Sequence, residues 1–185
     1  MPTSDLPLPL ALAFPESRRE AFASYAGHWL ANEALTFTPG ETVRVAGQAL
    51  TLPRRINLNR RKLVDSWGCD NVQREHADLV LALGSRHHDG YYRESCVRKL
   101  LAGQPSWTLP YVLAPLGEYV LEIGEAILDG WDMLDSGALS SFCADNPALV
   151  DRLRRRATSY WDCYYRTRFP RQDDYPPWQA LCRLP

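Results

Sequence analysis

The stretch Leu116–Leu134, LGEYVLEIGEAILDGWDML, decides the predicted fold because it sorts its residues onto two faces. At about 100° per residue, the apolar side chains fall on one side of a helix and the acidic side chains on the other. The apolar face comprises Leu116, Tyr119, Val120, Ile123, Ile127, Trp131 and Leu134. The opposite face, here called the acidic strip, comprises Glu118, Glu122, Glu125, Asp129 and Asp132. One continuous amphipathic helix is therefore expected.

The acidic strip has no cation of its own to offset its charge. Neither Lys nor Arg occurs in the stretch, and like charges four residues apart repel by about 0.2–0.5 kcal/mol per pair in an isolated helix. Two interpretations follow. The strip is a solvated face partly neutralised by arginines elsewhere in the chain, or it is a docking surface for a basic partner.

The chain length, net charge and cysteine count set limits on the class of protein. The 185 residues fit a single domain, 1–185, and no linker divides them. The net charge of −1 excludes a general affinity for nucleic acid, so such binding would need a local patch. Five cysteines without a CxxC pair are typical of reduced thiols in a cytoplasmic protein. Residues 1–14 contain prolines and no Lys or Arg, which predicts an extended surface arm and neither a signal peptide nor a membrane span.

Most of the chain shows helical periodicity. Apolar side chains recur at three- and four-residue spacing in 16–33, 71–83, 91–101 and 147–169. Asn146 is the expected N-cap of the last helix, and its apolar face is expected to include Tyr164. The prolines at 110 and 115 are expected to break the helix between these segments.

Residues 42–52 have a different pattern. Val43 and Val45 alternate with polar neighbours between glycine turns, which predicts a small β-hairpin. A two-stranded ribbon is marginal alone, so we expect it to lean on the helices. It either caps the helical core or protrudes as a recognition arm.

Five cations follow the hairpin within nine residues: Arg54, Arg55, Arg60, Arg61 and Lys62. Such a cluster can grip phosphates, but it also forms solvated helix starts or pairs with acidic faces. The sequence favours the second group of explanations.

No motif points to catalysis or to a metal. His87, His88 and Asp89 invite a metal site, yet adjacent histidines rarely face one ion, and Asp89-Gly90 is explained as a turn. GxSxG, HExxH, CxxC and glycine-rich phosphate loops do not occur in the sequence. Five acids along a helix describe a strip, whereas catalytic carboxylates usually lie in a concave pocket. We therefore predict no catalytic residues, no metal, no cofactor, and a binding protein rather than an enzyme.

Two helix pairs follow one another in the sequence, ADLVLALGSRHHDGYYRESCVRKLL at 77–101 and TLPYVLAPLGEYVLEIGEAILDGW at 108–131. In each, an apolar helix runs into a polar turn and a second helix carries a small residue, Cys96 or Ala126.

Residues 70–132 resemble the HEAT-repeat proteins of bacteria. The matching positions are Pro110 in a first helix, Asp89-Gly90 and Glu118 in the turns, and Tyr92-Arg93 as the Val-Arg pair of a second helix. The second repeat departs from the pattern, with Ile123-Gly124 in place of Ile-Arg. The resemblance implies a mainly all-α fold of stacked antiparallel helical hairpins over 70–168. It also implies binding of another macromolecule, since most of the family are scaffolds and a minority are DNA-repair glycosylases.

Together these patterns predict a non-enzymatic module that docks a basic protein on the acidic strip, as an immunity or inhibitor protein blocks a cationic toxin. Tyr119 and Trp107 are the expected aromatic anchors at its edge. The less favoured alternative is nucleic-acid binding by the last helix, because most of its aromatics are needed by the core. In that alternative the contacts come from Arg152, Arg155, Arg156 and Arg166, interleaved with Tyr160, Trp161, Tyr164, Tyr165 and Phe169.

Overall fold

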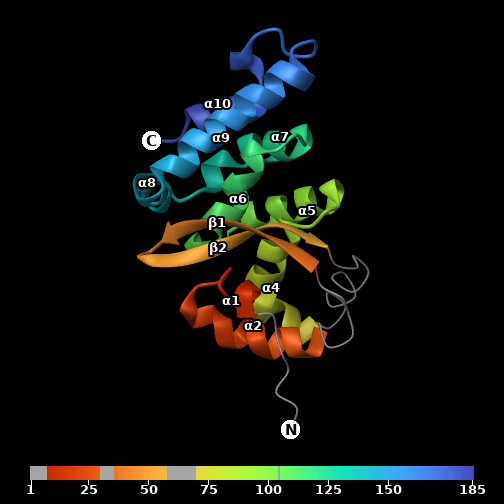
Figure 1. Cartoon of the computed structure of the whole chain (residues 1–185), viewed down its shortest axis with the longest axis vertical. Coiled ribbons are helices and arrows are strands. Elements are labelled where there is room, and N and C mark those ends of the chain that lie inside the picture. The colour runs from red at the N-terminus through yellow and green to blue at the C-terminus, as the bar shows by residue number, and fades with distance from the viewer. Residues whose placement is uncertain (1–7, 30–35, 58–69, 104) are drawn as a thin grey trace.

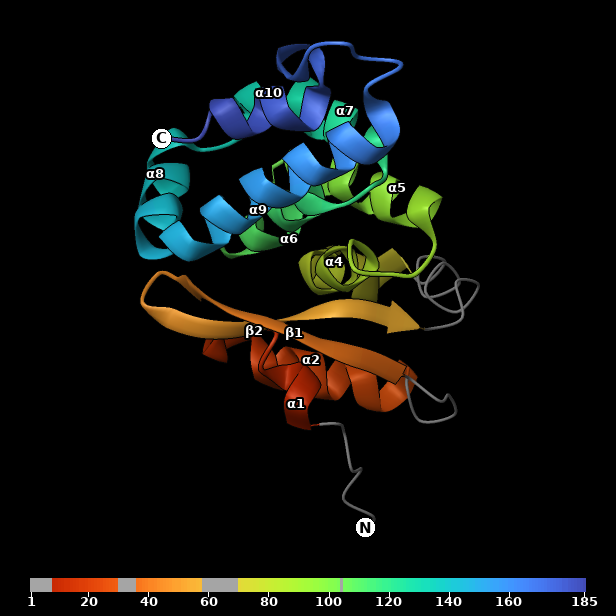
Figure 2. The same cartoon turned by 45° about the horizontal axis from the view of Figure 1, so that its top comes forward.

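The structure, a computed structural model, describes residues 8–29, 36–57, 70–103 and 105–185. As predicted, it is mainly helical with one small antiparallel sheet. Helices α1 (Leu8–Ala11) and α2 (Glu16–Trp29) lie on one side of a β-hairpin (Figure 1). Helix α4 (Asp70–Gly84) runs past the hairpin and contacts α2, and the remaining helices form a body on the other side. The tilted view in Figure 2 shows the hairpin as a layer between the two groups of helices.

The N-terminal segment folds back onto the domain. Helix α1 (Leu8–Ala11) and the turn after it bury Leu10 and Phe14, and the hydroxyl of Tyr111 donates to the Ala13 carbonyl at 2.5 Å. The predicted extended arm is therefore wrong for residues 8–14, because burying these apolar side chains stabilises a turn against the core. The rest of the predicted arm, 1–7, lies outside the described residues. Helix α2 (Glu16–Trp29) follows directly.

The predicted hairpin is present and is longer than 42–52. Strands β1 (Thr36–Val45) and β2 (Gln48–Asn57) pair antiparallel. They are joined at Ala46 and Gly47, whose φ angles are 48° and 78°. Positive φ at both central residues matches the right-handed twist of the strands, which explains a glycine at the second position. The hairpin is sandwiched between helices, so it caps the core and does not protrude.

The helical body is built from segments joined by short turns. Its α-helices are α4 (Asp70–Gly84), α5 (Gly90–Leu101), α6 (Leu109–Leu113), α7 (Leu121–Asp129), α8 (Ser136–Asp145), α9 (Pro147–Tyr160) and α10 (Pro176–Cys182). The 3₁₀ turns are η2 (Ser106–Thr108), η3 (Ala114–Gly117), η4 (Trp131–Met133) and η6 (Gln172–Asp174), and η5 (Trp161–Tyr165) is a π turn. The predicted turn at Asp89-Gly90 is instead a helix start: Gly90 is the first residue of α5, and Asp89 caps the helix by accepting from the backbone N–H of Tyr91 at 2.9 Å.

The continuous helix expected over 116–134 is wrong. The chain forms η3, then extended backbone at Glu118 (ψ 167°) and Val120 (ψ 103°), and only then α7 and η4. Gly117 packs so closely on α9 that a side chain would not fit there, because a Cβ at this position would lie 2.8 Å from Cδ2 of Leu153. The break lets η3 lie against α9 and turns Glu118 into the interior.

Asn146 is the N-cap of α9, as predicted, and its carbonyl accepts from the N–H groups of Leu149 and Val150, but its side chain makes no cap hydrogen bond. Its Nδ2 donates to the Arg44 carbonyl and its Oδ1 accepts from the Arg44 N–H, both at 2.8 Å, so it ties the α8–α9 corner to β1. Tyr164, predicted to lie on the buried face of the last helix, is 69% exposed, because the π turn η5 adds residues per turn and rotates the side chains out of the α-helical register.

Candidate functional site

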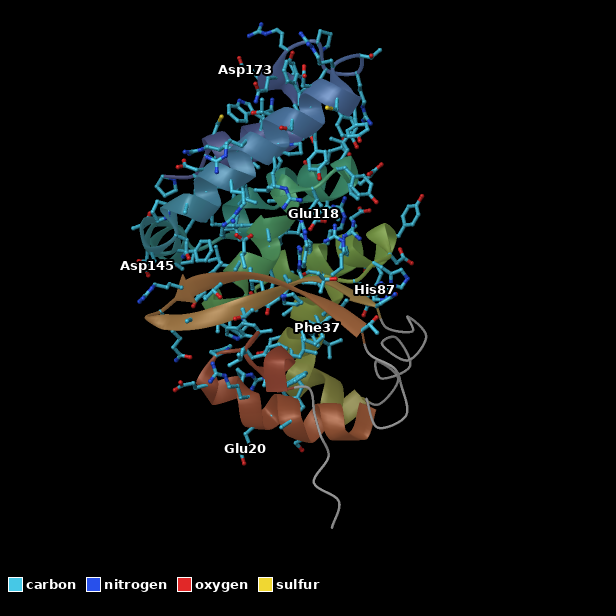
Figure 3. All side chains as sticks on the ribbon, in the orientation of Figure 1. Glu20, Phe37, His87, Glu118, Asp145 and Asp173 are labelled. Atoms are coloured by element: carbon cyan, nitrogen blue, oxygen red, sulfur yellow. The ribbon has the colours of Figure 1, made fainter. Side chains whose placement is uncertain are left out.

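Glu118, the first member of the acidic strip, is buried and only 3% exposed. Arg55 donates to both of its carboxylate oxygens, and Arg86 donates to Oε1, all at 2.8 Å. Nε of Arg93 lies 3.4 Å from Oε2. Figure 3 shows Glu118 in the middle of the molecule, between the hairpin and the helical body. Neutralisation by the chain's own arginines, one of the two interpretations left open, therefore holds for this residue.

The three arginines come from separate parts of the fold, and each of them also donates to a backbone carbonyl, Arg55 to that of Arg54 at 2.8 Å. Arg86, in the turn between α4 and α5, donates to the carbonyls of Pro53 and Arg54 on β2, both at 2.9 Å. Arg93 on α5 donates to the His87 carbonyl at 2.9 Å. The cluster thus bonds the hairpin to the helical body through charged groups.

The electrostatics of the cluster follow from three cations around one anion. Burial would raise the pKa of Glu118, but the charges of Arg86, Arg55 and Arg93 prevail and lower it below its ordinary value. Burial lowers the pKa of Arg86 and of Arg93, and the Glu118 charge opposes that shift. Guanidinium groups stay protonated in proteins, so the cluster keeps a surplus of positive charge.

Acid is expected to weaken the fold through this carboxylate. The pKa of Glu118 is lower in the folded chain than its ordinary value of 4.5. Below 4.5 the unfolded chain therefore binds more protons, so stability present above that pH is lost as pH falls through the folded pKa. Urea denaturation at a series of pH values tests this: Glu118→Gln should show a shallower loss than the wild type. Parallel curves for the two proteins would contradict it.

A cleft of about 510 Å³ opens beside the cluster, and we call it the arginine cleft. Its walls are the hairpin at 40–41 and 52–55, the segment 114–119, and α9. The charged residues that line it are Glu41, Arg54, Arg55, Arg86, Glu118, Arg152 and Arg156. Five arginines against two glutamates make the lining positive, and a concave, low-dielectric wall focuses that potential.

The arginines of the cleft divide into a fixed floor and an open rim. The floor consists of Arg55 and Arg86, both of which donate to Glu118, and Arg86 is 6% exposed and also donates to backbone carbonyls. Arg54, Arg152 and Arg156 stand at the rim, where Arg54 is exposed and the side chain of Arg152 stays 45% exposed while it pairs with Glu41. Among the residues that the structure describes, no acidic side chain forms an ion pair with Arg54 or Arg156. Arg54 and Arg156 can therefore meet an incoming anion directly, whereas Arg152 would exchange its pair with Glu41 for one.

An aromatic hollow of about 490 Å³, here called the tyrosine groove, adjoins the arginine cleft. It is lined by Tyr119, Tyr160, Tyr164 and Tyr165, of which Tyr119 and Tyr160 also line the cleft. The rings of Tyr160 and Tyr164 are stacked, with centroids 6.2 Å apart. The Tyr165 hydroxyl donates to the Tyr119 carbonyl and holds that turn in place. The cationic and aromatic surfaces are thus continuous.

The rest of the acidic strip is not gathered at this site. Glu122 and Asp129 are exposed on α7, and Asp132 is exposed on η4. Glu125 pairs with Arg168 at 3.2 Å. The structure therefore separates the buried Glu118 from the members that remain at the surface.

The two predicted aromatic anchors, Tyr119 and Trp107, lie in different parts of the structure. Tyr119 is 56% exposed but borders the arginine cleft. Trp107 packs edge-on against Phe14 and Tyr111, each with ring centroids 5.9 Å away, next to the N-terminal segment. Trp107 is thus a packing residue of the α1 side of the domain.

Two of the four arginines named for nucleic-acid binding line the cleft, namely Arg152 and Arg156. Arg155 is exposed outside it, and Arg166 pairs with Asp162 at 2.8 Å. The predicted cation cluster included Arg54 and Arg55, which lie on β2 within the hairpin and not after it. Arg60, Arg61 and Lys62 lie outside the described residues. No sequence signal pointed to Arg86, because its role depends on contacts with β2 and Glu118.

The histidine turn is part of the fold. His87 is buried, and its Nδ1 accepts from the Asp89 N–H at 3.0 Å. Within 8–29, 36–57, 70–103 and 105–185, His, Cys, Asp and Glu side chains do not gather in threes to form a metal site, and no helix is long and apolar enough to cross a bilayer. Comparisons of the chain with models of protein families, with curated proteins and with solved structures found no match.

Proposed function

We propose that the protein is a non-enzymatic binding module whose arginine cleft holds an anionic segment of a macromolecular partner. The observation that carries this proposal is the lining itself, in which five arginines from β2, the α4–α5 turn and α9 converge on one cleft. Guanidinium groups suit phosphate and carboxylate ligands because their planar fork donates two parallel hydrogen bonds.

The buried carboxylate supports a binding role over a catalytic one. Glu118 is surrounded by Arg55, Arg86 and Arg93, which lower its pKa, so it stays ionised at neutral pH and has no proton to give as a general acid. Its oxygens are occupied by those guanidinium groups. Glu118 instead holds the floor arginines in fixed positions, so less side-chain conformational entropy is lost when a ligand binds.

Charge reversal at the rim should abolish most of the affinity for a simple polyanion. We expect Arg156→Glu to weaken binding of labelled inorganic polyphosphate about 10-fold or more, since one phosphate contact becomes a repulsion. Arg155→Glu is the matched control, because it makes the same change one residue away, outside the cleft. Fluorescence anisotropy at low salt measures both. Equal losses in the two variants would show that general charge, and not the cleft, governs binding.

A second candidate surface is the exposed part of the acidic strip, which supports the docking of a basic protein such as a toxin. Glu122, Asp129 and Asp132 are exposed, and in the described part of the chain none of them takes part in an ion pair. Exposed like charges of this kind accelerate association with an oppositely charged partner.

The double variant Glu122→Lys with Asp129→Lys tests this second candidate. Its free energy of unfolding should change by no more than about 0.5 kcal/mol, because both positions are exposed. Basic proteins that the wild type captures from the parent cell's lysate should be lost from the variant but kept by Arg155→Glu. Capture of the same basic proteins by the double variant would exclude the strip as their docking surface.

The HEAT-like stacking of helical hairpins stays a proposal as well. It is supported by the contacts of α5 with α4, α6 and α7, through which successive helices cover one another's apolar faces.

A further inference from the structure

We propose that the arginine cleft and the tyrosine groove together bind single-stranded nucleic acid, with phosphates at the rim arginines and bases on the exposed tyrosines. This inference rests on the proposed function and names the class of its anionic ligand. It is carried by the arrangement of the two surfaces along α9.

Cations and aromatic rings form one row on this helix and its π turn. Arg152, Arg156, Tyr160 and Tyr164 follow one another at intervals of four residues. The first two line the arginine cleft, the last two line the tyrosine groove, and Tyr160 lines both. At a rise of about 1.5 Å per residue the row spans about 18 Å. A chain that leaves the cleft along this row therefore passes from cations to ring faces.

The tyrosine groove offers ring surface that the core does not use. Tyr119 is 56% exposed and Tyr164 is 69% exposed. Beneath them, Tyr165 stacks on the fully buried Tyr175 with ring centroids 5.3 Å apart, which anchors the groove to the core. Large exposed rings on a rigid support are the usual platforms on which unpaired bases stack.

The combination favours a single strand over the other polyanions. A duplex presents phosphates but keeps the faces of its bases inside the stack, so the tyrosines would gain nothing from it. An acidic peptide would satisfy the arginines and leave the rings exposed. An unpaired strand offers both groups at once, and Arg156 over Tyr160, at 6.0 Å from the ring centroid, already joins cation and ring at the junction of the two surfaces.

The test separates the contribution of bases from that of phosphates. Anisotropy would be measured with a labelled thymidine oligonucleotide of about twelve nucleotides, an abasic strand of the same length, the matching duplex, and polyglutamate. The thymidine strand should bind about 5-fold or more tighter than the abasic strand, with the duplex and polyglutamate weaker still. Tyr164→Ala should remove the preference for bases and leave abasic binding unchanged, whereas Tyr164→Phe should keep the preference. Since Tyr164 is exposed, both variants should fold, as thermal melting would verify.

The salt dependence identifies the phosphate contacts. Arg156→Ala should lower the slope of log K against log salt by about 0.7 for the thymidine and abasic strands alike, while Arg155→Ala should not. Equal binding of thymidine and abasic strands, unaffected by Tyr164→Ala, would overturn the single-strand inference and leave the anion-binding cleft intact. Preference for duplex or polyglutamate would overturn it in favour of that ligand. No binding of any strand or of polyphosphate would overturn the proposed function as well.

Discussion

Replacing Glu118 with Gln is expected to lower the free energy of unfolding by about 3–5 kcal/mol, the cost of removing one partner from a buried ion pair. The amide keeps the shape of the side chain but leaves Arg55, Arg86 and Arg93 without the only carboxylate among the described residues that pairs with them. Three guanidinium groups then repel one another in a poorly solvated place, and the hairpin loses its charged link to the helical body.

Urea denaturation at neutral pH measures this effect. Glu122→Gln is the matched control, because it makes the same chemical change at an exposed position of the acidic strip and should stay within about 0.5 kcal/mol of the wild type. If both variants unfold at the same urea concentration, the cluster around Glu118 does not stabilise the fold.

Adding one methyl group at Gly124 is the second large effect. A Cβ at this position of α7 would lie 2.4 Å from Cγ and 3.0 Å from Cδ of Pro177, a rigid, buried ring at the start of α10. We expect Gly124→Ala to destabilise the protein by about 1–3 kcal/mol through overpacking. The sign of this change in stability distinguishes overpacking from helix propensity, since Ala is otherwise favoured over Gly inside a helix by about 0.5–1 kcal/mol.

The control for this prediction is Gly137→Ala on α8. There the nearest atom to a new Cβ is Oδ1 of Asp135 at 3.4 Å, and the position is exposed, so the variant should be as stable as the wild type or more stable. A Gly124→Ala protein that matches this control would show that α10 does not pack closely on α7. A longer side chain at position 124 would displace α10.

The sequence predicted those elements whose stability depends on local spacing. The hairpin and α4, α5 and α9 follow apolar periodicity and turn residues that lie within each segment. The break at 117–120 could not be read in this way. Periodicity in this stretch indicates one helix, whereas Glu118 is drawn inward by Arg86 and Arg55, which are 32 and 63 residues away in the chain. Tertiary charge pairing prevailed over local pattern.

The candidate site was only partly predictable for the same reason. The spacing on the last helix named Arg152 and Arg156 as nucleic-acid contacts, but it could not bring Arg54 or Arg86 to the same cleft. Nor could the spacing predict that Tyr164 is exposed, because the sequence carries no clear signal for a π turn. An α-helical register assigns that ring to the core, and the turn η5 moves it into the tyrosine groove.

The backbone contacts along the hairpin carry one more consequence. On the outer side of β1, Asn146 occupies both backbone groups of Arg44. On the outer side of β2, the Thr51 N–H donates to the Leu12 carbonyl at 2.8 Å. Further along β2, the Ile56 N–H donates to the Arg86 carbonyl at 2.8 Å, and the Ile56 carbonyl accepts from the His88 N–H at 3.0 Å. Unpaired backbone N–H and C=O groups on an edge strand can form hydrogen bonds with a strand of another molecule. Here those positions are already filled by an amide side chain and two stretches of the same polypeptide, which protects a sheet of only two strands against edge-to-edge aggregation.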